Sequence, residues 1–126
     1  MSEWENFTRE EFACKCGCGT NEIQDETIDV AQDIRSEVGF PLPISSGYRC
    51  PNHPVEARKS SPGTHPEGLA GDIEVSYGRA KKVLTAALNH PKVTGVGVNQ
   101  KGAGRFIHFD TAPVAEGRPR PHVWSY

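Results

Sequence analysis

Two histidines and an aspartate are placed in the sequence so that they could hold a metal ion. His65 lies in the segment GTHPEGLAGD, seven residues before Asp72, and His108 lies in RFIHFDT. Pro66 and Gly68 disfavour a helix between the first pair, so we expect a turn running into a strand to bring the imidazole and the carboxylate together. Two imidazoles and one carboxylate are a ligand set typical of catalytic zinc, which keeps one coordination position for water.

The second histidine is expected in a strand, where alternate residues share a face of the sheet. On that spacing Phe106, His108 and Asp110 point to one side, and Ile107 and Phe109 point to the other. His108 and Asp110 can therefore both contribute to one site, while the apolar residues Ile107 and Phe109 hold the strand from its other face. Spacing alone does not separate a metal site from ordinary histidines and acids in a chain with five histidines.

The elements that must position these residues are two helices and several short strands. We expect helices over 25–38 and 79–89, because apolar residues recur in each at helical spacing and Gly39 and Pro91 follow them. Thr8 and Glu11 form a capping-box pattern for one further helical turn. Strands are expected near residue 44, over 69–75, 93–98 and 105–110, and as an edge strand in the tail GRPRPHVWSY. This order predicts an α+β fold with N-terminal helices and a small antiparallel sheet, in which residues 50–69 form a long functional loop.

Length and composition bound the class of protein. The chain has 126 residues, 36% of them apolar and 24% charged, which predicts one globular domain over residues 1–126, and we expect a monomer. A net charge of -2 gives no general attraction to nucleic acid or to anionic membranes. No segment has the ~20 apolar residues that insert across a bilayer. The N-terminal MSEWENFTREEF has no apolar stretch like that of a secretory signal, so we expect the protein to be made and first kept in the cytoplasm.

Four cysteines leave three interpretations open. Cys14, Cys16 and Cys18 form a C-x-C-x-C cluster, and Cys50 follows Arg49. Free thiols are expected in a reducing cytoplasm, and disulfides formed after release from the cell are the first alternative. A structural four-thiolate zinc site is the second, although C-x-C spacing is tighter than the usual two to four intervening residues.

Four segments in order resemble the motifs of a known peptidase family. They are SGYRCPNHP (46–54), HPEGLAGD (65–72), GVGV (95–98) and FIHFDT (106–111), and EFACKCGCG resembles a segment that precedes these motifs in many members. The family is that of the D-alanyl-D-alanine carboxypeptidases, the LAS-type metallopeptidases of peptidase family M15, which include bacteriophage L-alanyl-D-glutamate endolysins. The resemblance spans most of the chain and implies an LAS/hedgehog-like zinc peptidase domain.

The resemblance also implies roles for individual residues. His65, Asp72 and His108 match the three zinc ligands, so one Zn²⁺ per chain is expected. Arg49 matches an arginine that binds a substrate carboxylate, and a guanidinium fork suits bidentate recognition of such a group.

The general base is where the sequence departs from the family pattern. Many relatives have Glu, Asp or His two to five residues before the third ligand, but residues 103–106 read Ala, Gly, Arg and Phe and cannot accept a proton. We prefer His122 as the base. Asp110 is the alternative, although it could instead orient a ligand imidazole, and Glu67 is a more distant candidate.

The function implied by the resemblance is zinc-dependent hydrolysis of a peptide bond in peptidoglycan stem peptides. A phage or prophage endolysin released to the cell wall fits that activity, and a dipeptidase acting on small soluble peptides is the nearest alternative. The missing base favours a different class, a weakly active or inactive cell-wall-binding or virion module that retains zinc for stability.

Overall fold

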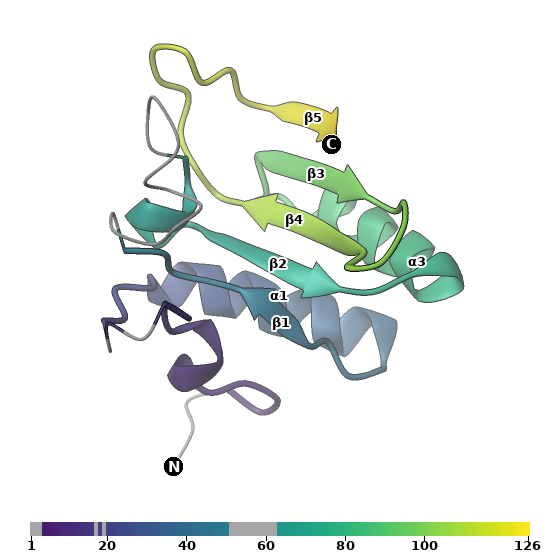
Figure 1. Cartoon of the computed structure of the whole chain (residues 1–126). Coiled ribbons are helices and arrows are strands. Elements are labelled where there is room, and N and C mark those ends of the chain that lie inside the picture. Colours follow the sequence, from purple (N-terminus) through teal and green to yellow (C-terminus); the bar gives the residue numbers. More distant parts are fainter. Residues whose placement is uncertain (1–3, 17, 19, 51–62) are drawn as a thin grey trace.

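A five-stranded sheet with the strand order β1-β2-β4-β3-β5 organises the molecule (Figure 1). The computed structural model describes residues 4–16, 18, 20–50 and 63–126, so the predicted loop 50–69 is seen only at its ends. The strands are β1 (Ile44–Ser46), β2 (Ala70–Glu74), β3 (Gly95–Asn99), β4 (Phe106–Asp110) and β5 (His122–Ser125).

The strand pairing is mixed. Strand β2 pairs antiparallel with β1 and β4, and β4 pairs antiparallel with β3, whereas β5 runs parallel to β3. The predicted α+β class is confirmed, and the parallel edge strand is the one departure from an antiparallel sheet. It arises because residues 111–121 carry the chain back across the end of the sheet before β5 begins (Figure 1).

Two α-helices cover one face of the sheet. Helix α1 (Asp25–Val38) has the predicted bounds, and α3 (Tyr77–Asn89), which joins β2 to β3, begins two residues before the predicted start. Both lie behind the sheet in Figure 1. Their apolar faces pack on one core with the inward side chains of the sheet, among them Ile73, Val96, Ile107 and Phe109. Neither helix of the described chain is long and apolar enough to cross a membrane.

Two short 3₁₀ turns complete the fold of the described residues. The first, η1 (Arg9–Phe12), has the capping box predicted at Thr8 and Glu11. The second, η2 (His65–Glu67), lies where the sequence predicted no helix. A single turn forms there because Pro66 stands at its start, where a missing N–H costs no hydrogen bond.

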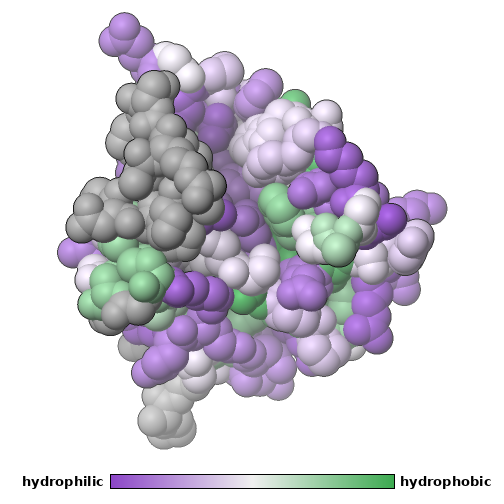
Figure 2. All heavy atoms as spheres, viewed as in Figure 1, coloured by the Kyte–Doolittle hydropathy of each residue, from purple (hydrophilic) through white to green (hydrophobic). Residues whose placement is uncertain are grey.

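The side of the sheet away from the helices is polar. Along β4, Ile107 and Phe109 are buried in the core, so His108 and Asp110 belong to the opposite side, as the alternation predicted. Figure 2 shows this side as mostly hydrophilic, with small scattered hydrophobic groups.

Candidate metal centre

Three predicted ligands converge on the polar side of the sheet. Asp72 on β2 is the direct cross-strand partner of His108 on β4, and η2 brings His65 back over the start of β2. The Asp72 Oδ1 atom lies 3.3 Å from His65 Nε2 and 3.0 Å from His108 Nδ1. All three side chains are buried, and their ligand atoms lie within 4.8 Å of one another.

These distances fit one tetrahedrally coordinated zinc ion. Metal–nitrogen and metal–oxygen bonds of ~2.0–2.1 Å place neighbouring ligand atoms of a tetrahedron ~3.3 Å apart. The separations of 3.3 and 3.0 Å between Asp72 Oδ1 and the two imidazole nitrogens match that edge. The donor set and its spacing therefore suit the ion that the sequence predicted.

The second nitrogen of each imidazole has its own hydrogen-bond acceptor. His65 Nδ1 lies 2.7 Å from the Gly47 carbonyl oxygen, which can only accept. His108 Nε2 lies 2.8 Å from Asp110 Oδ2. Each of these nitrogens can therefore donate its hydrogen outward, so that His65 Nε2 and His108 Nδ1 would be free to bind a metal ion in place of their contacts with Asp72.

The acceptor for His65 depends on a close backbone approach at Gly47. A Cβ atom at this position would lie 2.6 Å from the Phe12 carbonyl oxygen, closer than any side chain tolerates. The same Phe12 oxygen accepts a 2.8 Å hydrogen bond from the Tyr48 N–H. Turn η1 thus sits directly on the segment after β1 and fixes the carbonyl that orients His65.

The acceptor for His108 is held by an arginine from the C-terminal tail. Arg120 Nε and Nη2 lie 3.0 and 2.8 Å from the two Asp110 oxygens, a bidentate pair. Asp110 is fully buried, and its Oδ1 also accepts from the Ala112 N–H at 3.3 Å. Sequence reasoning missed Arg120, because nothing in the tail's spacing shows that the chain returns to β4.

Burial and hydrogen bonding have opposite effects on the pKa values of the ionisable groups in this cluster. Burial by itself raises the pKa of Asp72, but hydrogen bonds from His108 and His65 outweigh burial and hold this pKa below its usual range. The same competition, with His108 and Arg120 as donors, lowers the pKa of Asp110. Burial alone would lower the pKa of His108, yet the Asp110 and Asp72 carboxylates raise it. Both carboxylates are therefore ionised at neutral pH and available to a cation.

Arg49 lies beside the three candidate ligands. Its Nη2 is 3.3 Å from Asp72 Oδ2, the oxygen that does not face the imidazoles, and its Nε donates to Ser46 Oγ at 2.9 Å. The side chain is 14% exposed. The guanidinium is thus at the site, as the sequence predicted, while its role as a substrate anchor stays a prediction.

His122 lies at the edge of the same side of the sheet. Its exposed ring stacks on Trp124 with the ring centroids 5.3 Å apart, and the Trp124 centroid is 5.0 Å from that of His108. Gly97 makes room for the indole, since a Cβ atom there would lie 2.7 Å from Trp124 Nε1. Trp124 therefore lies between His122 and His108, and the assignment of His122 as the base stays a prediction.

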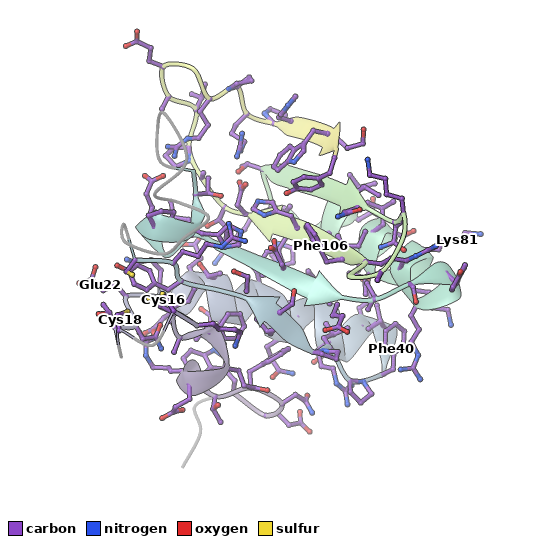
Figure 3. All side chains as sticks on the ribbon, in the orientation of Figure 1. Cys16, Cys18, Glu22, Phe40, Lys81 and Phe106 are labelled. Atoms are coloured by element: carbon purple, nitrogen blue, oxygen red, sulfur yellow. The ribbon has the colours of Figure 1, made fainter. Side chains whose placement is uncertain are left out.

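A hollow of about 590 Å³ opens onto the three candidate ligands. Arginines and aromatic side chains dominate the rest of its lining, namely Arg49, Arg118, Arg120, Phe106, Trp124 and Tyr126. Phe106 stands near the middle of this side in Figure 3. Arg118 pairs with Glu67, so the more distant base candidate is engaged by a guanidinium. Sequence reasoning did not single out Tyr126, whose phenol has a pKa raised by burial.

Comparison with known proteins agrees with this geometry. The model of the peptidase M15 family matches residues 5–110. The matched region contains His65, Asp72 and His108 and ends before Arg120 and Trp124. No curated protein matches the sequence.

Proposed function

We propose that this protein, which belongs to the peptidase M15 family, hydrolyses a peptide bond in peptidoglycan stem peptides with one zinc ion held by His65, Asp72 and His108. Membership implies a zinc-dependent metallopeptidase acting on peptidoglycan-type substrates. The observation that carries the residue assignment is the convergence of the three ligand atoms, with a hydrogen-bond acceptor beside the outer nitrogen of each imidazole.

The metal ion and the protein's own residues have separate roles in the reaction. Zinc, when bound, supplies a Lewis acid that polarises the scissile carbonyl and lowers the pKa of water. Asp110 and the Gly47 carbonyl accept hydrogen bonds from the outer nitrogens of the two ligand imidazoles and so orient their rings toward the metal position. Arg49, at the edge of the hollow, binds a carboxylate of the stem peptide. The aromatic wall around Trp124 packs against the substrate and excludes water from one side.

A proton carrier is still needed to take a proton from water and deliver it to the leaving amine. Asp110 is poorly placed for this role, because it is fully buried and held by Arg120 and His108. We therefore keep His122, whose exposed ring stacks on the far side of Trp124 from His108. Tyr126 is a second candidate for the donor step, because its phenol lines the hollow and is protonated at neutral pH.

The biological setting follows from the substrate. Arg49, Arg118 and Arg120 line the hollow, but Arg118 and Arg120 already pair with Glu67 and Asp110, so Arg49 is the group that we assign to a carboxylate of the stem peptide. We propose that the protein is an endolysin of a phage or prophage, made in the cytoplasm and active on the wall once the membrane is permeabilised. The cleaved bond would be either the terminal D-Ala-D-Ala bond or an internal L-Ala-D-Glu bond.

A binding module is the competing proposal. The feature that favours it is the run Ala103, Gly104, Arg105 and Phe106, which holds no base where relatives have one. Such a protein would keep zinc for stability and bind the wall without cutting it.

The test combines metal analysis with digestion of purified peptidoglycan. His65→Ala and His108→Ala should each lose one zinc per chain relative to the parent protein, and both should lose hydrolysis. Mass spectrometry of the released fragments identifies the bond that is cut. If both variants keep all their zinc, the ligand assignment is wrong. If the parent binds zinc and peptidoglycan but releases no fragments, the binding-module proposal is correct.

A further inference from the structure

The sulfur atoms of the four cysteines lie close together, where the loop after η1 meets the segment after β1. Cys14, Cys16 and Cys18 follow η1, and Cys50 lies beyond β1, more than thirty residues later. Cys16 Sγ is 3.3 Å from both Cys14 Sγ and Cys50 Sγ, and all four sulfur atoms lie within 4.8 Å of one another. Figure 3 shows Cys16 and Cys18 close together at one side of the molecule, away from Phe106.

We propose that Cys14, Cys16, Cys18 and Cys50 bind a second zinc ion as four thiolates. Zinc–sulfur bonds of ~2.3 Å place the sulfurs of a tetrahedral site ~3.8 Å apart, and separations between 3.3 and 4.8 Å surround that value. None of the four is in a disulfide, whose sulfurs would lie ~2.05 Å apart. Sulfurs this close to one another accommodate a single ion.

The surroundings of the sulfurs favour thiolates. The Cys50 N–H points at Cys14 Sγ and the Thr20 N–H points at Cys18 Sγ, each at 3.3 Å. Backbone N–H groups that point at a sulfur stabilise its thiolate form, which is the form that binds a metal ion.

The tight C-x-C spacing is accommodated by the loop that carries it. The Cys14 N–H donates to the Thr20 carbonyl at 3.2 Å, which closes the loop and turns its three cysteines toward Cys50. Cys14 and Cys50 are buried and Cys16 and Cys18 are exposed. The ion would thus be half enclosed, with its two buried ligands anchored in the core.

The second ion would support the first site without touching it. Cys50 adjoins Arg49, whose N–H faces the His65 carbonyl at 3.4 Å. Tyr48 in turn is hydrogen bonded to Phe12, two residues before Cys14. Four zinc–sulfur bonds would tie the N-terminal turn to the segment that carries both Arg49 and the Gly47 acceptor. The site is structural, because four protein ligands leave no open position.

Metal stoichiometry tests the proposal on the full chain purified under reducing conditions. The parent should hold two zinc ions per chain, the His65→Ala/His108→Ala variant one, and Cys16→Ser/Cys18→Ser one. Lys15→Ser, an exposed change in the same loop, should keep two. X-ray absorption at the zinc edge of the double-histidine variant should show only sulfur neighbours, near ~2.3 Å. If the double-cysteine variant does not fold, Cys18→Ser alone removes one exposed ligand and should add an oxygen neighbour or lose the zinc.

The outcomes separate this proposal from the proposed function. One sulfur-bound zinc in both the parent and the double-histidine variant would support the thiolate site and overturn the histidine site. A double-histidine variant that holds no metal would overturn the thiolate site, as would disulfides found by intact mass in the freshly purified protein. Iron in place of zinc on sulfur ligands would also overturn the assignment.

Discussion

Replacing Asp110 with asparagine should weaken zinc binding although Asp110 is not a ligand. The carboxylate accepts a hydrogen bond from His108 Nε2 and a bidentate pair from Arg120. An amide has only one acceptor oxygen. If that oxygen faces Arg120, the NH₂ group faces His108 and moves the imidazole hydrogen to Nδ1, the nitrogen needed for the metal. If the oxygen faces His108, the NH₂ group faces a guanidinium that also only donates.

The size of the effect follows from burial. The side chains of Asp110 and Arg120 are 0% and 8% exposed, so solvent screens their interaction little. Loss of a hydrogen-bond partner of a ligand histidine typically costs about 10–100-fold in metal affinity. Uncoupling a buried ion pair destabilises a protein by about 3–5 kcal/mol, so the zinc-free variant should also unfold more readily.

The pH profile gives a further readout. Because the folded-state pKa of Asp110 lies below its usual range, its stabilising contribution is present above pH ~4 and is lost as the pH falls toward that lower value. The acid side of the stability profile should therefore be flatter in Asp110→Asn than in the parent.

The assay is a competition for zinc against a chromophoric chelator, together with thermal unfolding of the zinc-free protein. Asp33→Asn is a matched control, because Asp33 also pairs with a histidine, His90 Nε2 at 2.9 Å, but lies on α1 with a side chain 66% exposed. It should change neither zinc affinity nor, beyond ~1 kcal/mol, stability. Parental zinc affinity in Asp110→Asn would refute the idea that this carboxylate sets the imidazole tautomer.

Three further predictions address the substrate side of the site. Arg49→Lys keeps the charge but loses the fork, so kcat/KM should fall on the order of tenfold with zinc content and melting temperature nearly unchanged; loss of zinc would show instead that Arg49 serves to hold a ligand. His122→Ala should keep zinc and lower kcat by roughly 10²–10⁴-fold, and parental turnover would remove this residue from the mechanism. Gly97→Ala places a Cβ atom 2.7 Å from Trp124 Nε1, so it should raise KM and destabilise by about 1–3 kcal/mol. Gly78→Ala in α3, which meets nothing within 4 Å, is the control; it should leave KM unchanged and raise stability by up to about 1 kcal/mol.

The sequence predicted most of what depends on local pattern. Helix α1 and the core side of β4 followed from apolar spacing, because burial of one face imposes a period of 3.6 or 2 on the residues themselves. The pairing of Asp72 with His108 is a long-range contact, and it was expected only through the ordered motifs of a resembled family. The structure places the two residues directly opposite each other.

Features that depend on how the chain turns back after β4 could not be predicted from the sequence. The parallel pairing of β5 with β3, the Arg120 clamp on Asp110 and the indole over Gly97 all depend on the path of residues 111–121. That path has no periodic signal, because its residues are mostly exposed and bury no regular face. The meeting of Cys50 with the C-x-C-x-C loop was one of three interpretations that the sequence left open, and the contact between η1 and the segment after β1 brings the two together.

The central position of β4 has a consequence for how the metal acts on folding. β4 lies between β2 and β3, although α3 and β3 separate it from β2 in the sequence. Asp72 and His108 therefore become neighbours only after the β3–β4 pair has docked on β2, and the partly assembled chain offers the ion two ligands instead of three. Zinc at 100 times its Kd would add ~2.7 kcal/mol to the assembled sheet. We expect this to appear as slower unfolding rather than faster folding, because the interaction forms late.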